Sequence, residues 1–307
     1  MSPGEFTFQW GGAIFVILTM FILVCPVNAL SIQGISDQPV KKAEVGDISI
    51  GYREFGTGQP LILIMGYSGA MDIWDPVLLQ NLSSQYRVII FDNRGVGTTS
   101  YSGAEYSIPL FARDTAGLMD ALHISRADVL GWSMGGNIAL ELAVDYPEKV
   151  KSLVLYAADA GGEQAILMTP DVQKQLTNGS GTDRERGERL LGLILPAPWL
   201  KEHPDPRTYF PDATEPVNNT TIIDQIHALS TWKGVFDQLS TIRCPTLLIT
   251  GDQDRIIPPE NTERIAGEIP SAKVIQIPGG GHGVMYQDPE LFAGYVLDFL
   301  NNSTYQE

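Results

Sequence analysis

The chain has 307 residues, of which 44% are hydrophobic and 18% are charged, a composition typical of a folded globular protein rather than a disordered one. This length allows one large domain with an insertion. The formal net charge of −16 argues against nucleic acid as a partner, because an acidic surface repels phosphate. The two cysteines and four histidines form no cluster with metal-ligand spacing, so we expect neither a metal nor a cofactor.

Residues 11–30 are almost wholly apolar, too long and too hydrophobic a run for an exposed soluble helix. Two interpretations stay open, a cleaved secretory signal peptide and a single membrane anchor. Val27-Asn28-Ala29 resembles the small-residue cleavage pattern, whereas a signal peptide usually carries Lys or Arg before its apolar run and this one does not. We expect residues 1–30 to make the protein extracytoplasmic, either secreted or membrane-anchored, and residues 31–43 to form a polar linker. The alternative is a location on the cytoplasmic face of a membrane.

Strand-like and helix-like runs alternate over residues 44–158 and 239–302, which is the signature of a parallel sheet with helical crossovers. Several strand runs are continuously apolar, as expected for strands that are covered on both faces. We therefore predict an α/β core with a mostly parallel central sheet flanked by helices. The candidate strands are Ile48–Phe55, Leu61–Met65, Val88–Phe91, Asp128–Gly131, Ser152–Tyr156, Thr246–Thr250 and Lys273–Ile277, and the candidate helices are Pro109–Leu122, Gly136–Asp145 and one from Pro289 to about Leu300.

The alternation stops between residues 159 and 238, where helical patches are separated by prolines and no strand run occurs. This pattern predicts a helical lid inserted over a cleft, which would exclude water and shape a substrate pocket. Apolar side chains of this region either line such a pocket or simply pack the lid onto the core. They are Met168, Leu193, Ile194, Leu195, Trp199, Tyr209, Phe210 and Trp232.

The run Gly131–Gly135 (Gly-Trp-Ser-Met-Gly) stands between a strand-like and a helix-like run. A strand that turns sharply into a helix needs glycines on both sides, because side chains would collide there, and its central residue is strained. Ser133 is then held out of the strand end, and the Met134 N–H lies at a helix N-terminus that favours an anion. The motif alone also arises by chance in a glycine-rich chain, so its strand–turn–helix setting is what supports Ser133 as a nucleophile.

A serine nucleophile needs a base, and the sequence offers four histidines. His123 lies in a polar connection before the serine, His203 lies among prolines, and His227 lies in a helical stretch. His282 alone follows a strand-like run, in the flexible turn Pro278–Gly283. We therefore predict His282 as the base.

The orienting acid is expected between the serine and the histidine in chain order. Both Asp252 and Asp254 follow the buried strand run that ends at Gly251. We favour Asp254 as the acid, because an Asp directly after Gly, such as Asp252, commonly caps its own turn.

With these motifs the chain resembles the serine-type α/β-hydrolases that carry a lid, the esterase, lactonase and non-haem haloperoxidase group, from about Gly46 to Phe299. In that family the acid ends a Gly-x-x-Asp turn, which matches Asp254. The second oxyanion donor is the N–H two residues after a His in a His-Gly-x motif; here Met65 replaces the His, and the donor carries over to Tyr67. The motifs that carry the resemblance are Leu61–Tyr67, Phe91–Ser100, Gly131–Gly135, Gly251–Asp254 and Gly281-His282.

The turn Asp92-Asn93-Arg94-Gly95 is the remaining polar motif at a strand end. We expect its aspartate and arginine to tie loops together rather than to do chemistry. It does not form a phosphate-binding glycine loop that opens a helix, so no nucleotide is implied.

The main functional prediction is a serine hydrolase that acts on carboxylic esters, lactones or thioesters through an acyl-enzyme intermediate. Ser133, Asp254 and His282 would be catalytic, and the N–H groups of Tyr67 and Met134 would hold the oxyanion. One alternative keeps this triad for carbon–carbon bond hydrolysis or perhydrolysis, and another is a non-catalytic protein that binds a small molecule as a receptor. The expected partner is a small acyl substrate, with possible membrane anchoring through residues 1–30, and the oligomeric state is not readable from the sequence.

Overall fold

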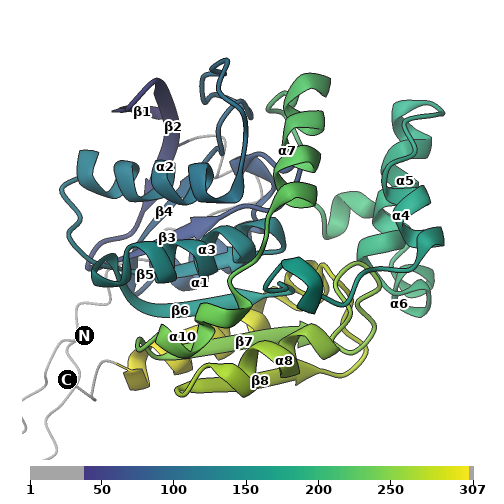
Figure 1. Ribbon diagram of the computed structural model, residues 1–307. Coiled ribbons are helices and arrows are strands. Elements are labelled where there is room, and N and C mark those ends of the chain that lie inside the picture. The colour runs from purple at the N-terminus through teal and green to yellow at the C-terminus, as the bar shows by residue number, and fades with distance from the viewer. Residues whose placement is uncertain (1–37, 304–307) are drawn as a thin grey trace, which may run out of the picture.

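The computed structural model describes residues 38–303, so the predictions for residues 1–30 and for most of the linker lie outside the described part of the chain (Figure 1). Within the described range, eight strands form one sheet in the order β1-β2-β4-β3-β5-β6-β7-β8. The pairs β1/β2 and β2/β4 are antiparallel, and every pair from β4 to β8 is parallel. The strands are β1 Lys41–Val45, β2 Ile48–Phe55, β3 Gln59–Ile64, β4 Tyr86–Phe91, β5 Ala127–Trp132, β6 Val150–Tyr156, β7 Thr246–Gly251 and β8 Ala272–Ile277.

The central strands form because their residues are apolar on both faces, and all six residues of β5 are buried. Successive residues of β3 contribute to two separate apolar layers, since side chains alternate across a strand: Ile62 and Ile64 to one, Leu61 and Leu63 to the other. The first layer is covered by α2 (Ile108–Ala121) and α3 (Met134–Asp145), and the second by α1 (Pro76–Ser83) and α10 (Pro289–Ser303) (Figure 1). The predicted α/β architecture is confirmed.

The predicted linker at residues 31–43 is wrong at its end, because Lys41–Ala43 belong to β1. This strand is at the edge of the sheet and pairs antiparallel with β2, with Lys41 opposite Tyr52. Two lysines and a glutamate among its five residues are exposed. A short, charged edge strand lacks the continuous apolar run by which the central strands are recognised.

Proline and side-chain caps mark the helix starts that the sequence displays. Ser107 accepts a hydrogen bond from the Leu110 N–H at the start of α2, and Asp75 accepts one from the Leu78 N–H at the start of α1. The predicted helices correspond to α2, α3 and α10 within two or three residues at each end. The local sequence pattern did not predict α1, α8 (Glu260–Glu268) or the short α9 (Val284–Gln287).

Residues 159–238, here called the inserted segment, contain four α-helices among the residues described. Figure 1 shows α4, α5 and α6 gathered at one end of the sheet, with α7 standing apart from them. The segment's only contribution to strand pairing, within the described range, is a single bridge between Val217 and Val96. The helices are α4 Pro170–Leu176, α5 Asp183–Ile194, α6 Ala197–Glu202 and α7 Asn219–Thr231.

The fold places the candidate site residues at one edge of the sheet. Strands β3, β5, β7 and β8 run parallel, so their carboxyl ends meet along the same edge. Tyr67, Ser133, Asp254 and His282 each follow one of these ends. Between residues 38 and 303 we find no helix that combines the length and the apolar character needed to cross a bilayer.

Candidate active site

Ser133 lies at a sharp turn between β5 and α3 with backbone angles φ 55° and ψ −122°, a conformation that L-residues rarely adopt. The flanking glycines are required by contact distances. A Cβ on Gly131 would lie 2.2 Å from the carbonyl oxygen of Gly135, and a Cβ on Gly135 would lie 2.0 Å from that of Ile64. The expectation that side chains would collide at this turn is therefore confirmed.

Two backbone N–H groups lie beside Ser133 without a protein acceptor among the described residues. Met134 is the first residue of α3, and the N–H of a first helical residue has no partner within the helix. The first turn of the helix closes behind it, with the Gly136 N–H donating to the Ser133 carbonyl at 2.7 Å. Tyr67 follows Gly66, and a Cβ added to Gly66 would lie 3.2 Å from the Cβ of Ser133 and 3.8 Å from the Ser133 Oγ. The Tyr67 loop thus lies against the serine, as an oxyanion site requires.

Met65, which stands where the family pattern has a histidine, is fully buried. Its side chain packs beneath Gly69, since a Cβ there would come within 2.7 Å of Met65 Cγ. The backbone of the loop is held by the core: Asn93 Nδ2 donates to the Met65 carbonyl at 3.0 Å, and Asp92 Oδ1 accepts from the Met71 N–H at 2.8 Å. An apolar side chain therefore fills this position, and the hydrogen bonds made by Asn93 and Asp92 hold the backbone of the loop.

Asp254 and His282 form a buried pair, with 2.8 Å between Asp254 Oδ2 and His282 Nδ1. The other carboxylate oxygen, Oδ1, accepts from the N–H groups of Ile256 and Ile257, both at 2.9 Å. These bonds fix the orientation of the carboxylate. Because a carboxylate only accepts hydrogen bonds, its contact with His282 Nδ1 requires a hydrogen on that nitrogen. In the neutral ring Nε2 is then the acceptor, as a general base requires.

Asp252 is exposed and serves its own turn, with Oδ1 accepting from the Gly279 N–H at 2.8 Å. The structure thus separates the two candidate acids: Asp254 lies on the imidazole, and Asp252 ties the β7 turn to the turn after β8.

The backbone of His282 is held by two aromatic side chains that the sequence analysis did not assign to the site. Trp132 Nε1 donates to the His282 carbonyl at 3.0 Å, and the Tyr156 hydroxyl donates to the same oxygen at 2.6 Å. Both residues end strands, β5 and β6, and their rings stack with centroids 6.1 Å apart. Nothing in the local pattern marks Tyr156, because its partner is 126 residues away in the chain.

His282 and Ser133 are therefore neighbours through Trp132, which directly precedes the serine and whose ring centroid lies 5.6 Å from the imidazole. Among the described residues no hydrogen bond joins Ser133 Oγ directly to the His282 ring. The other candidate bases lie elsewhere. His203 stacks on Trp199 at 4.0 Å, and His227 pairs with exposed Glu105 at 3.1 Å.

Arg94 is structural, as expected for its motif. It is 1% exposed and lies between two carboxylates, with Nε 2.8 Å from Asp114 Oδ2 and Nη1 2.9 Å from Asp47 Oδ2. The hydrogen bond from Arg94 lowers the pKa of Asp47 to about 2. This arginine joins α2 to the β1–β2 turn and does not reach the serine turn.

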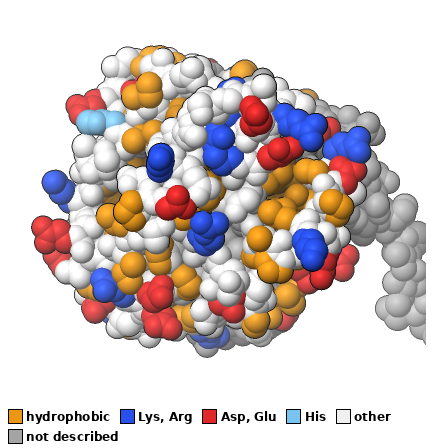
Figure 2. Space-filling view, turned by 90° about the vertical axis from the view of Figure 1, so that its right-hand side faces the viewer, with side chains coloured by type: hydrophobic (Ala, Val, Ile, Leu, Met, Phe, Trp, Pro, Cys, Tyr) orange, Lys and Arg blue, Asp and Glu red, His pale blue; other side chains and the backbone are white. Residues whose placement is uncertain are grey.

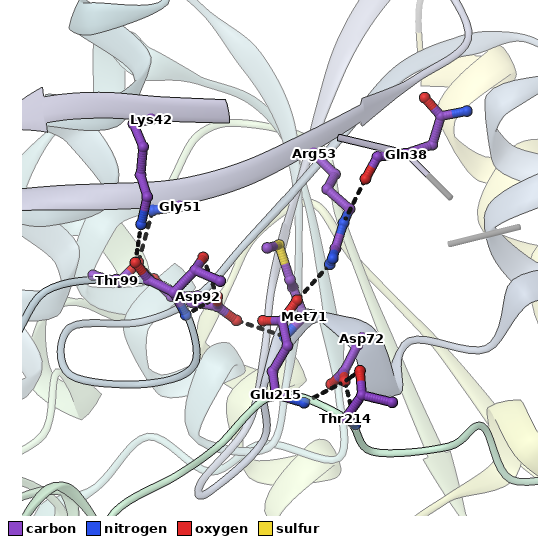
Figure 3. A network of polar contacts seen from close by, with 11 residues as sticks. Gln38, Lys42, Gly51, Arg53, Met71, Asp72, Asp92, Thr99, Thr214 and Glu215 are labelled. Carbon is purple, nitrogen blue, oxygen red and sulfur yellow. Dashed lines mark hydrogen bonds and ion pairs between the residues drawn. The ribbon is translucent and has the colours of Figure 1, made fainter. Parts of the chain in front are cut away.

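A polar network fastens the inserted segment to the core (Figure 3). Asp72 Oδ2 accepts from the N–H of Thr214 at 2.6 Å and from that of Glu215 at 2.8 Å. Glu215 in turn accepts from Arg53 Nη1 at 2.6 Å, and its second oxygen faces the Asp92 carboxylate. Burial and the neighbouring Asp92 carboxylate raise the pKa of Glu215 from 4.5 to about 7, against the opposing effect of Arg53.

The face that carries α4, α5 and α6 shows hydrophobic side chains gathered in a hollow, with charged residues around it (Figure 2). The inserted segment contributes large apolar side chains to the surface: Leu167 is 79% exposed, Ile223 64% and Leu190 43%. The predicted pocket residues are divided, since Leu193–Leu195 are buried against the core whereas Trp199 is only partly buried. No group of three or more His, Cys, Asp or Glu residues is arranged to hold a metal ion between residues 38 and 303.

Comparison with known proteins agrees with this architecture. The family model described as alpha/beta hydrolase fold matches residues 59–194 and 199–289. A candidate carbamate hydrolase, RutD, from Pseudomonas syringae pv. syringae is 31% identical over 252 residues, which cover 78% of this chain and 93% of that protein. A candidate non-heme chloroperoxidase from Synechocystis sp. is 28% identical over 279 residues, 82% of this chain and 95% of that one.

Among solved structures, an alpha/beta hydrolase fold protein from Chitinophaga pinensis superposes with a TM-score of 0.75 at 26% identity, covering 86% of this chain and 97% of that one. The chain therefore belongs to the alpha/beta hydrolase fold family, and its matches indicate a hydrolase of that family.

Proposed function

We propose that this protein is a serine hydrolase that cleaves carboxylic esters, lactones or thioesters through an acyl-enzyme. The observation that carries the proposal is the buried pair of Asp254 and His282, 2.8 Å apart, beside a serine on a strained turn. Buried titratable groups that converge from separate strand ends are the usual mark of a catalytic site.

Each residue has a defined role in this mechanism. Ser133 Oγ attacks the acyl carbon while His282 Nε2 takes its proton, and Asp254 stabilises the imidazolium that forms. The N–H groups of Tyr67 and Met134 donate to the oxyanion, and one such donor lowers the barrier by about 3 kcal/mol. His282 then returns the proton to the leaving group, and water attacks the acyl-enzyme by the same route in reverse.

The names of the relatives extend the range of acyl substrates to consider, without changing these residue roles. A carbamate has the same acyl carbon, bonded to nitrogen, so the name of the Pseudomonas syringae relative is compatible with attack by Ser133. The name of the Synechocystis relative favours perhydrolysis as the second candidate, in which hydrogen peroxide replaces water in the second step. The apolar side chains on the inserted segment favour an uncharged acyl group.

We further propose that the inserted segment acts as a lid, and that residues 1–30 place the enzyme outside the cytoplasm, secreted or anchored. The lid proposal is supported by the helical character of the segment and by its docking on the core through polar contacts beside the candidate site, and the location by the apolar run at residues 11–30. Fractionation of cells that express the full chain would test the location, and recovery in the cytosol alone would contradict it.

The decisive experiment compares two neighbouring aspartates and the serine in the full chain. We expect Ser133→Ala to lower kcat on p-nitrophenyl butyrate by about 10³-fold or more with an unchanged thermal midpoint, and Asp254→Asn to lower kcat by a similar factor. Asp252→Asn is the matched control and should retain kcat within a few-fold. A fluorophosphonate probe should label the wild type at Ser133, and labelling at another residue, or turnover that survives Ser133→Ala, would exclude this mechanism.

A further inference from the structure

Helix α7 of the inserted segment reaches the oxyanion loop, here defined as residues 65–69, with one side chain. Gln225 Oε1 accepts a hydrogen bond from the Ser68 N–H at 2.8 Å. Because a backbone N–H must meet an acceptor, this bond also decides which end of the amide faces the loop. The contact joins residues 157 positions apart and is made next to Tyr67, the proposed oxyanion donor.

The oxyanion loop needs such support. Ser68 has φ 59°, a left-handed conformation that is uncommon for a residue other than glycine. Inside the loop one weak turn bond is present, from the Gly69 N–H to the Gly66 carbonyl at 3.3 Å. The peptide unit between Tyr67 and Ser68 is planar, so a partner on the Ser68 N–H fixes the plane that adjoins the Tyr67 Cα.

Gln225 occupies a buried position, where an amide side chain costs more desolvation free energy than an apolar one. It is fully buried, on the same face of α7 as Thr221 and Ala228, which are also fully buried. Its Nε2 is buried without a hydrogen-bond partner among the described residues. An unpaired buried donor is destabilising, so the acceptor at the other end of the amide is the feature that accounts for a glutamine here.

Thr221 provides the comparison, since it anchors the same helix without touching the oxyanion loop. Its Oγ1 donates to the Gly95 carbonyl at 2.9 Å. Both residues dock α7 on the core, but Gln225 alone of the two connects that docking to the loop beside Ser133.

We propose that Gln225 is a positioning residue, which holds the oxyanion loop in the conformation that presents the Tyr67 N–H to the substrate. The inference rests on the proposed serine hydrolase function and extends it: α7 must be docked for the oxyanion site to be complete. Opening of the inserted segment then removes catalytic competence as well as the cover over the site.

The test compares four variants of the full chain on p-nitrophenyl butyrate. Gln225→Met keeps the volume and removes the acceptor, and we expect kcat to fall at least tenfold while KM changes less than twofold. Gln225→Glu keeps an oxygen acceptor in either protonation state and should restore kcat to within threefold of the wild type. Gln225→Asn, whose amide is one methylene short, should resemble Gln225→Met and serves if that variant does not fold.

Thr221→Val is the matched control, because it removes the other anchor of α7. It removes a hydrogen bond of the same helix but should leave kcat within twofold. The rate of fluorophosphonate labelling should follow kcat across the series, since it needs the same oxyanion site. Wild-type kcat in Gln225→Met or Gln225→Asn, or an equal loss of kcat in Thr221→Val, would overturn the inference. The serine mechanism would stand in either case, because it is tested by Ser133→Ala.

Discussion

The edge of the sheet that carries the candidate triad and the inserted segment that lies over it are stabilised in different ways. Strand β5 is buried along its whole length, and the residues that follow the strand ends are held by backbone hydrogen bonds. Helix α5, by contrast, begins with an exposed capping box of Thr182 and Glu185 and buries only its last residues. Continuous apolar burial stabilises the first region.

The inserted segment is attached at separate polar points: Asp72 with Thr214, Arg53 with Glu215, and Ser68 with Gln225. Leu193–Leu195 are also buried against the core, yet the segment contributes only one bridge to strand pairing within the described range, so we expect it to open locally without unfolding the sheet. The comparison therefore predicts global effects for changes in the first region and local ones for changes in the second.

The largest effect is expected from Gly135→Ala. The new Cβ would lie 2.0 Å from the Ile64 carbonyl oxygen and 2.9 Å from that of Met65. Both contacts are with backbone atoms at the end of β3 and directly after it, which can move only at a large cost in free energy. We expect a loss of about 4 kcal/mol in the free energy of unfolding, measured by urea denaturation. A loss below about 1 kcal/mol would show that the serine turn relaxes more easily than its contacts imply.

Glu215 gives the next largest effect, as a dependence of stability on pH. Its pKa is about 7 in the folded state and 4.5 when unshifted, so between these values the folded chain binds a proton that the unfolded chain does not. Stability is therefore favoured below pH 4.5 and falls as pH rises to about 7, by at most about 3 kcal/mol. The charged groups that face this carboxyl are Arg53 and Asp92, whereas Asp72 accepts from the Glu215 backbone N–H.

Glu215→Gln should remove this contribution, since its amide can donate to Asp92 and accept from Arg53 without titrating. Urea denaturation at pH 5 and pH 8 should give a smaller difference for the variant than for the wild type. The exposed Glu290→Gln is the control and should keep the wild-type difference. Equal pH dependence in Glu215→Gln and the wild type would contradict the assignment.

Asp72→Asn should act locally. The change keeps one oxygen for the N–H groups of Thr214 and Glu215 but removes its charge, which weakens these bonds by about 1–2 kcal/mol. Amide hydrogen exchange at both residues should accelerate about tenfold, whereas exchange in β5 should not change. Faster exchange of Val129 and Leu130 to the same degree would show that the inserted segment and the sheet open together.

Gly187→Ala gives the smallest effect and has the opposite sign. Gly187 lies within α5, and a Cβ there meets no atom within 4 Å. Replacing a helical glycine stabilises the helix by about 0.5–1 kcal/mol. We expect slower amide exchange in α5 with little change in the global unfolding midpoint, and a rise of that midpoint by several degrees would mean that the two regions unfold as one.

Local patterns in the sequence were sufficient for the central strands and for the glycines of the serine turn. Continuous apolar runs identify β3 to β7, and the two glycines around Ser133 are needed for a contact that spans only a few residues. The edge strand β1 was missed because its exposed charges give no such run.

The sequence by itself therefore determined the α/β core and pointed to Ser133 and His282 as candidate catalytic residues, because periodicity and turn residues act over short distances along the chain. Only the tertiary structure decided that Asp254 rather than Asp252 meets His282, that Tyr156 holds the His282 carbonyl, and that Gln225 supports Ser68. These pairs are separated by 28, 126 and 157 residues, and such contacts depend on how distant elements pack, which no local pattern encodes.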